Sequence, residues 1–269
     1  MLRLPAVAGH FYPANPEALT SLVEGLTQSE SAAPKTKVRA CLVPHAGLAY
    51  SGGVAGAVFA RIALPKTILL LGVRHYPRGA DQAILSEGAF RTPLGDVPID
   101  TPLALELRKQ CPALQEDPIA HNQEHSLEVE LPFLQILDPG FRFVPIAVGP
   151  LRLSELQQTG EGIARALAKS TQEVLIVTSS DLNHYEDERT TRVKDQKAID
   201  QMMKIDGEGL YRVCREERIS MCGLGPAIVM LTALGKLGVS HAELIRHATS
   251  GDVNGDQSAV VGYGGLTFD

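Results

Sequence analysis

Three histidines each follow an apolar run that is typical of a buried strand. His45 comes after residues 41–44 (CLVP), His75 after 69–73 (LLLGV), and His184 shortly after 175–180 (LIVTSS). In open α/β sheets, ligands bind beyond the carboxyl ends of the strands. Three of the eight histidines therefore share one topological position. This pattern favours a metal site or an acid/base site at that edge of the sheet.

A further pair of histidines stands in residues 121–125 (HNQEH), which match the H-x-x-E-H pattern of one zinc-peptidase class. That mechanism needs both histidines on one helical face, with the glutamate between them as the base. The helical pattern here begins only at Ser126, which leaves His121 and Glu124 in the preceding loop. Two other interpretations stay open: a loop that bonds its own backbone, and a supporting role for Glu124 and His125 beside a site.

Cys222 differs from the other cysteines in its setting. It precedes a predicted helix at a glycine-flanked junction, where a helix N-terminus can lower the pKa of a thiol and make a thiolate available. The remaining three cysteines fit the pattern of small buried thiols, and the four show no CxxC spacing. They are Cys41, Cys111 and Cys214. A chain of this length needs no disulfides, so we expect free thiols in a reducing, cytoplasmic compartment.

The elements that must position these residues follow from hydrophobic periodicity. Short apolar runs, rich in β-branched residues, predict strands at 38–43, 67–73, 141–148, 174–178, 244–248 and 258–263. Apolar residues at three- and four-residue spacing predict helices at 17–26, 54–62, 102–109, 127–137, 153–169, 193–205 and 227–237.

This alternation of strands and helices predicts an α/β fold with three α/β/α layers and a mainly parallel sheet. No repeat, charge block or internal Pro/Ser-rich linker divides the chain. The most linker-like segment, residues 28–37, lies too near the N-terminus to separate two domains. We therefore expect a single domain over residues 1–269.

Composition excludes several classes of protein. The chain has 269 residues, of which 44% are hydrophobic and 21% charged, and this balance is far from that of disordered chains. The net charge of −6, without a basic stripe, argues against a nucleic-acid partner. The longest uncharged apolar stretch, residues 224–235, is well below the ~20 residues that span a bilayer. Neither membrane insertion nor an export signal is expected.

The sequence resembles the Memo-like family, whose microbial members are called AmmeMemoRadiSam system protein B. The resemblance runs over nearly the whole chain and depends on several short motifs in combination. These motifs are 8–13 (AGHFYP), 44–47 (PHAG) with 50–52 (YSG), 124–128 (EHSLE) with 131–132 (LP), 179–181 (SSD) with His184, and 222–223 (CG).

The resemblance implies a fold like that of the class III extradiol dioxygenases, which hold non-haem Fe(II) at the edge of an α/β sheet. It implies His45 and His75 as metal ligands and Cys222 as the third, in a place where the dioxygenases have a glutamate. Fe(II) is the favoured ion, with Cu or Zn as alternatives. A thiolate in place of the carboxylate argues against ring cleavage. The family name also implies a functional link to a radical SAM protein.

His184 matches the acid/base histidine of the dioxygenases, and Asp181 matches a carboxylate of the same pocket. We expect Asp181 to hold His184, which lies three residues later. Three functions remain open. The first is a metal-binding, redox-active protein of unknown substrate, and the second is a module that binds a phosphopeptide or protein in the same pocket without turnover. The third is a zinc-dependent hydrolase centred on His121 and His125.

Overall fold

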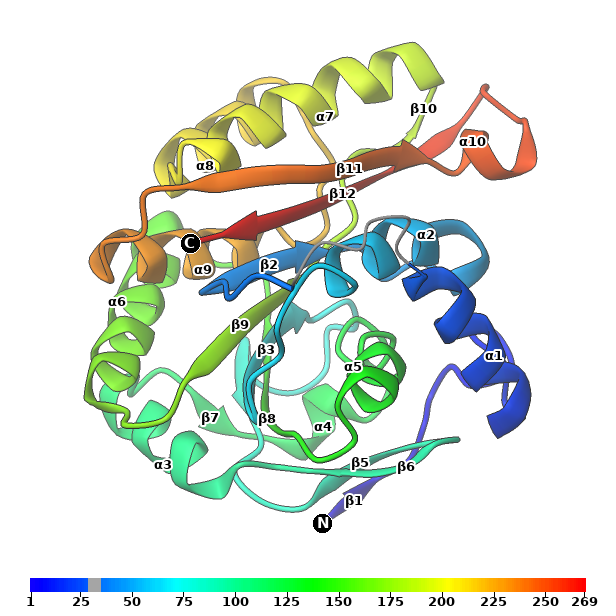
Figure 1. The fold of residues 1–269 in the computed structure, drawn as a ribbon. Helices are drawn as coiled ribbons and strands as arrows, with labels where there is room; N and C mark the ends of the chain where they lie inside the picture. Colours follow the sequence, from blue (N-terminus) through cyan, green and yellow to red (C-terminus); the bar gives the residue numbers. More distant parts are fainter. Residues whose placement is uncertain (29–34) are drawn as a thin grey trace.

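The computed structural model describes residues 1–28 and 35–269, and its centre is a mixed β-sheet (Figure 1). Most of the linker-like segment 28–37 lies outside the described residues. Within them the sheet has nine strands in the order β10-β12-β2-β9-β3-β8-β4-β7, and β11 pairs with β12. The four strands in the middle run parallel to one another. They are β2 (Ala40–Val43), β9 (Val174–Ser179), β3 (Thr67–Val73) and β8 (Arg142–Val148).

The parallel strands are apolar because both of their faces are covered. Every residue of β3 is buried. Its register pairs Leu71 with Thr178 of β9, and Val73 with Val148 of β8. In β2, Val43 pairs with Ser179. The carboxyl ends of these strands therefore meet at one edge of the sheet, and the predicted α/β class is confirmed.

Most strand pairings outside this centre are antiparallel, although β4 pairs parallel with β7, so the sheet is more mixed than the sequence predicts. β11 and β12 form a long hairpin, and β12 pairs antiparallel with β2. β4 is antiparallel to β8, and a separate three-stranded sheet has the order β1-β5-β6. The bounds are β1 (Leu2–Arg3), β4 (Gln82–Ile84), β5 (Ala89–Thr92), β6 (Gly95–Pro98), β7 (Gln115–Glu116), β10 (His184–Glu186), β11 (Ala242–Thr249) and β12 (Val260–Phe268).

Helices cover both faces of the sheet. In Figure 1, α6 and α9 lie on one side, and α1, α2 and α5 lie on the other. The first group is α6 (Leu153–Lys169) and α9 (Leu224–Lys236); the second is α1 (Pro16–Thr27), α2 (Leu48–Phe59) and α5 (Leu131–Leu137). The others are α3 (Thr101–Gln110), α4 (Pro118–His121), α7 (Glu188–Met203), α8 (Gly207–Glu216) and α10 (Gly251–Asn254).

One predicted helix begins later than expected, and one helix of the structure was not predicted. The helix expected at 127–137 begins only at Leu131, because the residues before it form turns. The sequence reasoning did not predict α8 at all. In the described part of the chain, no helix is both long and apolar enough to cross a membrane.

The N-terminal strand fixes the loop that precedes α5. Arg3 is 2% exposed and forms an ion pair with the buried Glu128, to which the Tyr12 hydroxyl also donates a hydrogen bond. The Arg3 guanidinium donates to the backbone carbonyls of His121 (3.1 Å) and Glu124 (2.5 Å). A buried ion pair is stable only when its remaining donors and acceptors are satisfied in this way. The loop over residues 121–128 is therefore tied to β1 at several points.

The close contact between α1 and α2 gives a test of this packing. A Cβ added at Gly56 of α2 would overlap the backbone carbonyl of Leu26, which cannot rotate away. We expect Gly56→Ala to lower the free energy of unfolding by about 2 kcal/mol or more. The measurement is urea denaturation followed by circular dichroism.

The matched control for this variant is Gly235→Ala. Gly235 lies inside α9, and a Cβ there meets no atom within 4 Å. Alanine should raise the free energy of unfolding by roughly 0.5–1 kcal/mol, because it restricts the unfolded chain and favours the helix. Equal stability of the two variants would contradict the packing of α1 on α2.

Candidate metal centre

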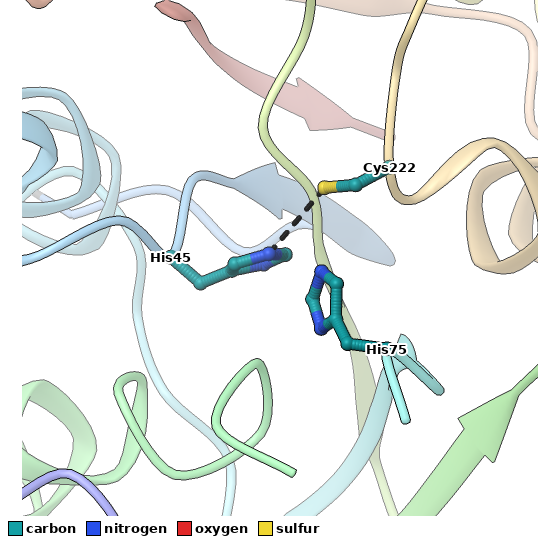
Figure 2. A group of neighbouring side chains, drawn as sticks. All are labelled: His45, His75 and Cys222. Atoms are coloured by element: carbon teal, nitrogen blue, oxygen red, sulfur yellow. Dashed lines mark hydrogen bonds between the residues drawn. The ribbon is translucent and has the colours of Figure 1, made fainter. Parts of the chain in front are cut away.

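Three potential metal ligands meet at the carboxyl edge of the sheet (Figure 2). His45 follows β2, His75 follows β3, and Cys222 precedes α9. Their ligand atoms all lie within 4.8 Å of one another. The Cys222 sulfur is 3.4 Å from His45 Nε2, and the two imidazole centroids are 5.2 Å apart. The structure thus brings together the three residues that the sequence singled out as ligands.

The orientation of His45 is set by a chain of hydrogen bonds behind it. Its Nδ1 lies 2.7 Å from the Ser179 hydroxyl, and that hydroxyl donates to Glu130 Oε1 at 2.8 Å. Because the single hydroxyl proton goes to Glu130, we infer that Nδ1–H of His45 donates to Ser179. Nε2 then keeps its lone pair and faces Cys222. Burial lowers the pKa of His45 to about 3, so the ring is neutral at neutral pH.

His75 is oriented by Glu124. Its Nδ1 lies 2.8 Å from Glu124 Oε1, and its backbone N–H donates to Oε2 at 2.7 Å. Burial alone would raise the pKa of Glu124, but the contacts with His75 and the N–H of Ser126 outweigh burial and lower it to about 2. A histidine that donates its second ring N–H to a carboxylate is typical of metal ligation. The Nε2 atom of His75 remains available to a ligand.

The thiol of Cys222 does not behave as the sequence predicts. Burial raises its pKa, and the negative charge of Asp181 acts in the same direction. The prediction that the helix N-terminus lowers the pKa of Cys222 was wrong, because the removal of the thiol from water outweighs the effect of the α9 dipole. Among its polar contacts, the sulfur accepts the Asp181 backbone N–H at 3.3 Å. The thiol therefore keeps its proton at neutral pH.

The three side chains border a cavity of about 590 Å³, which we call the histidine cavity. The His125 ring stacks on His75 with centroids 4.5 Å apart, and its side chain is 15% exposed. Burial lowers the pKa of His125 to about 4. Together with His75 and Glu124 it forms a second group of close donor atoms. Glu124 and His125 thus both lie at the site, and Phe11 closes part of the wall.

His184 and Asp181 also line the histidine cavity, but not in the expected arrangement. Asp181 Oδ1 accepts the backbone N–H of His45 at 2.9 Å, and no hydrogen bond joins it to His184 among the described residues. The carboxylate instead fixes the chain that leaves β2. His184 is anchored through its own backbone N–H, which donates to the Ser220 hydroxyl at 2.8 Å. The His184 Nδ1 atom is buried and has no partner within the described chain.

The structure does not bring His121 and His125 together. His121 ends α4, where it is fully buried with its ring 6.0 Å from that of Phe90. It belongs to none of the three groups of close donor atoms found in the described residues, whereas His125 lies at the site. The turns between the two histidines separate them, so the H-x-x-E-H pattern is not a peptidase site here.

Sequence reasoning assigned no role to Ser179, although the motif 179–181 contains it, and did not single out Glu130; both stand behind His45. Glu130 is fully buried, and burial raises its pKa well above the usual range. A signal for it exists in the sequence. In residues 126–134 (SLEVELPFL), Glu128 and Glu130 stand among apolar residues. A carboxyl group buried in such a run needs a specific hydrogen-bond or ion-pair partner.

Comparisons with known proteins agree with these motifs. The family model described as Memo-like protein matches residues 3–267. The MEMO1 family protein of Methanopyrus kandleri is 38% identical over 280 residues, covering 100% of this chain and 99% of its own length. The MEMO1 family protein of Sulfolobus acidocaldarius is also 38% identical, over 283 residues, with the same coverage of 100% and 99%.

A solved structure supports the fold independently. The crystal structure of an uncharacterized protein from Escherichia coli K12 superposes with a TM-score of 0.58 at 10% identity, covering 86% of this chain and 99% of that one. A likeness at this identity concerns the fold alone. The family match along almost the whole chain, together with relatives that are 38% identical over nearly their full length, shows that the chain belongs to the Memo-like protein family.

Proposed function

We propose that the protein binds one redox-active metal ion through His45, His75 and Cys222 and acts on a small ligand beside it. The observation that carries this proposal is the pair of hydrogen bonds behind the imidazoles. Ser179 and Glu124 occupy the two Nδ1 atoms, so both Nε2 atoms are left for a shared partner next to the Cys222 sulfur. Such outer hydrogen bonds are typical of ligating histidines.

The three proposed ligand side chains favour some metal ions over others. Two imidazoles and one thiolate suit Fe(II), Cu or Zn, and they suit Mg or Ca poorly. We favour Fe(II), with Cu as the second candidate. When bound, such an ion supplies a Lewis acid and a one-electron redox centre.

The residues around the ligands supply the rest of the chemistry. Glu124 and Ser179 keep the imidazoles in position. Phe11 and His125, whose ring centroids lie 4.9 Å apart, form part of the cavity wall. To His184, which lines the histidine cavity, we assign the exchange of a proton with a ligand bound there. Because a thiolate is softer and more easily oxidised than a carboxylate, we expect no ring opening of simple catechols.

Metal content after anaerobic purification tests the proposal directly. We expect about one Fe(II) or Cu per chain, and a sharp loss in His45→Ala, His75→Ala and Cys222→Ala, because each removes one donor. His184→Ala should keep the metal and lose ligand turnover. If the triple alanine variant retains wild-type stoichiometry, the site is misplaced. A wild type without metal would favour the phosphopeptide-binding alternative.

Proton release gives a second measurement. In the metal-free protein the raised pKa keeps Cys222 protonated, and the lowered pKa keeps His45 neutral. Binding of Zn²⁺, a redox-inert probe, should therefore release about one proton, and affinity should fall about tenfold for each unit by which the pH drops. Calorimetry in buffers of different ionisation enthalpy counts the proton. Cys222→Ser should bind weakly and release none; proton-neutral binding by the wild type would exclude the thiolate as a ligand.

The role assigned to Glu124 is tested by Glu124→Gln. The amide preserves size but removes the charge that holds His75 Nδ1–H, so Zn²⁺ affinity should fall roughly 10–100-fold. Because the amide NH2 must then face a buried N–H donor, the free energy of unfolding should also fall, by about 1–3 kcal/mol. Glu173→Gln is the control, because Glu173 is half exposed and pairs only with the exposed Lys37. Unchanged affinity in Glu124→Gln would show that the hydrogen bond does not position a ligand.

A further inference from the structure

A second cavity of about 410 Å³ adjoins the metal-ligand cluster. It shares only His75 and Cys222 with the histidine cavity. The remaining wall comes from the ends of β3 and β8 and from helices α6, α8 and α9. The proposed ligands thus separate two chambers. We call this one the arginine cavity, after Arg74 and Arg215 in its lining.

The charges of the arginine cavity are all positive. Among the described residues no aspartate or glutamate lines it, whereas Asp181 lines the histidine cavity. Arg74 stands directly before His75, and its side chain is 9% exposed. Its guanidinium pairs with Asp81, but Nε is buried and has no hydrogen-bond partner in the described chain. A buried donor without a partner costs about 1–3 kcal/mol, and the side chain that carries it lines the cavity.

Arg215 adds a cation that is not neutralised. It projects from α8, where its guanidinium lies 5.4 Å from the Tyr211 ring centroid and donates to the Tyr211 hydroxyl at 3.3 Å. No described carboxylate lies within ion-pair distance of it. Leu224 and Gly225, in the first turn of α9, also line the cavity. Backbone N–H groups at a helix start lack partners within the helix and favour anions.

The rest of the wall is apolar. Val148, Leu151 and Leu156 form one side, and Met221 contributes another part. The volume lies within the range of small-molecule sites, in which an apolar body is buried and a few polar groups fix its orientation. An anionic head group would meet Arg74 and Arg215, and an apolar body would extend along the aliphatic side chains.

We propose that the arginine cavity binds a small amphipathic organic anion, which is the substrate class of the adjoining metal centre. The substrate role rests on the proposed function, but the anion site itself does not. Arg215 is the main head-group contact. The anion lies beside His75 and Cys222, and the histidine cavity on the other side of these ligands leaves room for a second reactant.

Titration of the metal-free protein with phenylacetate tests the anion site, and 2-phenylethanol serves as its neutral analogue. The wild type should bind phenylacetate more tightly than the alcohol. Arg215→Gln should weaken phenylacetate at least about tenfold, since it removes a charge-assisted contact, and should leave the alcohol unchanged. The control is Arg212→Gln, an exposed arginine on the same helix that does not line the cavity. Phenyl phosphate, titrated in parallel, distinguishes the head groups.

Cobalt-loaded protein tests the substrate role separately. Phenylacetate should shift the visible absorption of bound Co(II) in the wild type, and the shift should require about tenfold more phenylacetate in Arg215→Gln. Equal affinity of phenylacetate for the wild type and Arg215→Gln would overturn the anion site whatever metal is bound. Tight phenylacetate binding with an unchanged cobalt spectrum would overturn the substrate role. Failure of Co(II) to bind, with phenylacetate binding intact, would overturn the proposed function and leave the anion site.

Discussion

The hydrogen bond between Glu124 and His75 is the contact on which the geometry of the site depends. It joins residues 49 positions apart in the sequence and requires a carboxylate that stays ionised although it is almost wholly buried. Two backbone N–H groups and the imidazole supply the compensation that burial demands. Arg3 holds the same loop from behind, through its carbonyl contacts and through Glu128. Strand β1 therefore helps to orient the His75 imidazole through the loop that carries Glu124, although β1 itself does not contact His75.

Much of the fold follows from local pattern. The four central strands and α6 could be predicted because long apolar runs and three- and four-residue spacing are local signals. The direction of β12 could not, since antiparallel pairing with β2 depends on a partner more than 200 residues away in the chain. α8 was missed because Gly207 and Gly209 have low helix propensity, although its own apolar residues Leu210 and Cys214 are buried and the helix packs against α9.

In the candidate site, too, some features could be predicted from local sequence, and others depend on contacts between distant segments. His45, His75 and His184 could be assigned to one edge from strand ends alone, and the resemblance added Cys222. The hydrogen-bond partners that orient the imidazole rings could not be predicted from the sequence in this way. Ser179 and Glu130 meet His45 only through the register of β2 with β9 and the turn before α5. The pKa of Cys222 was mispredicted because burial is a property of the folded environment, and the sequence showed only the nearby helix start.

The protonated thiol of Cys222 has a consequence for the reactivity of the metal-free protein. Oxidation to sulfenic acid and disulfide exchange both proceed through the thiolate, so a cysteine whose pKa is raised reacts slowly with peroxide. The other three cysteines are buried, so none of them offers an exposed thiol for exchange with Cys222. Desolvation disfavours ionisation of the Cys222 thiol, and it therefore also slows oxidation and disulfide exchange at this sulfur. We therefore expect the Cys222 thiol of the metal-free protein to react slowly with peroxide and with disulfides.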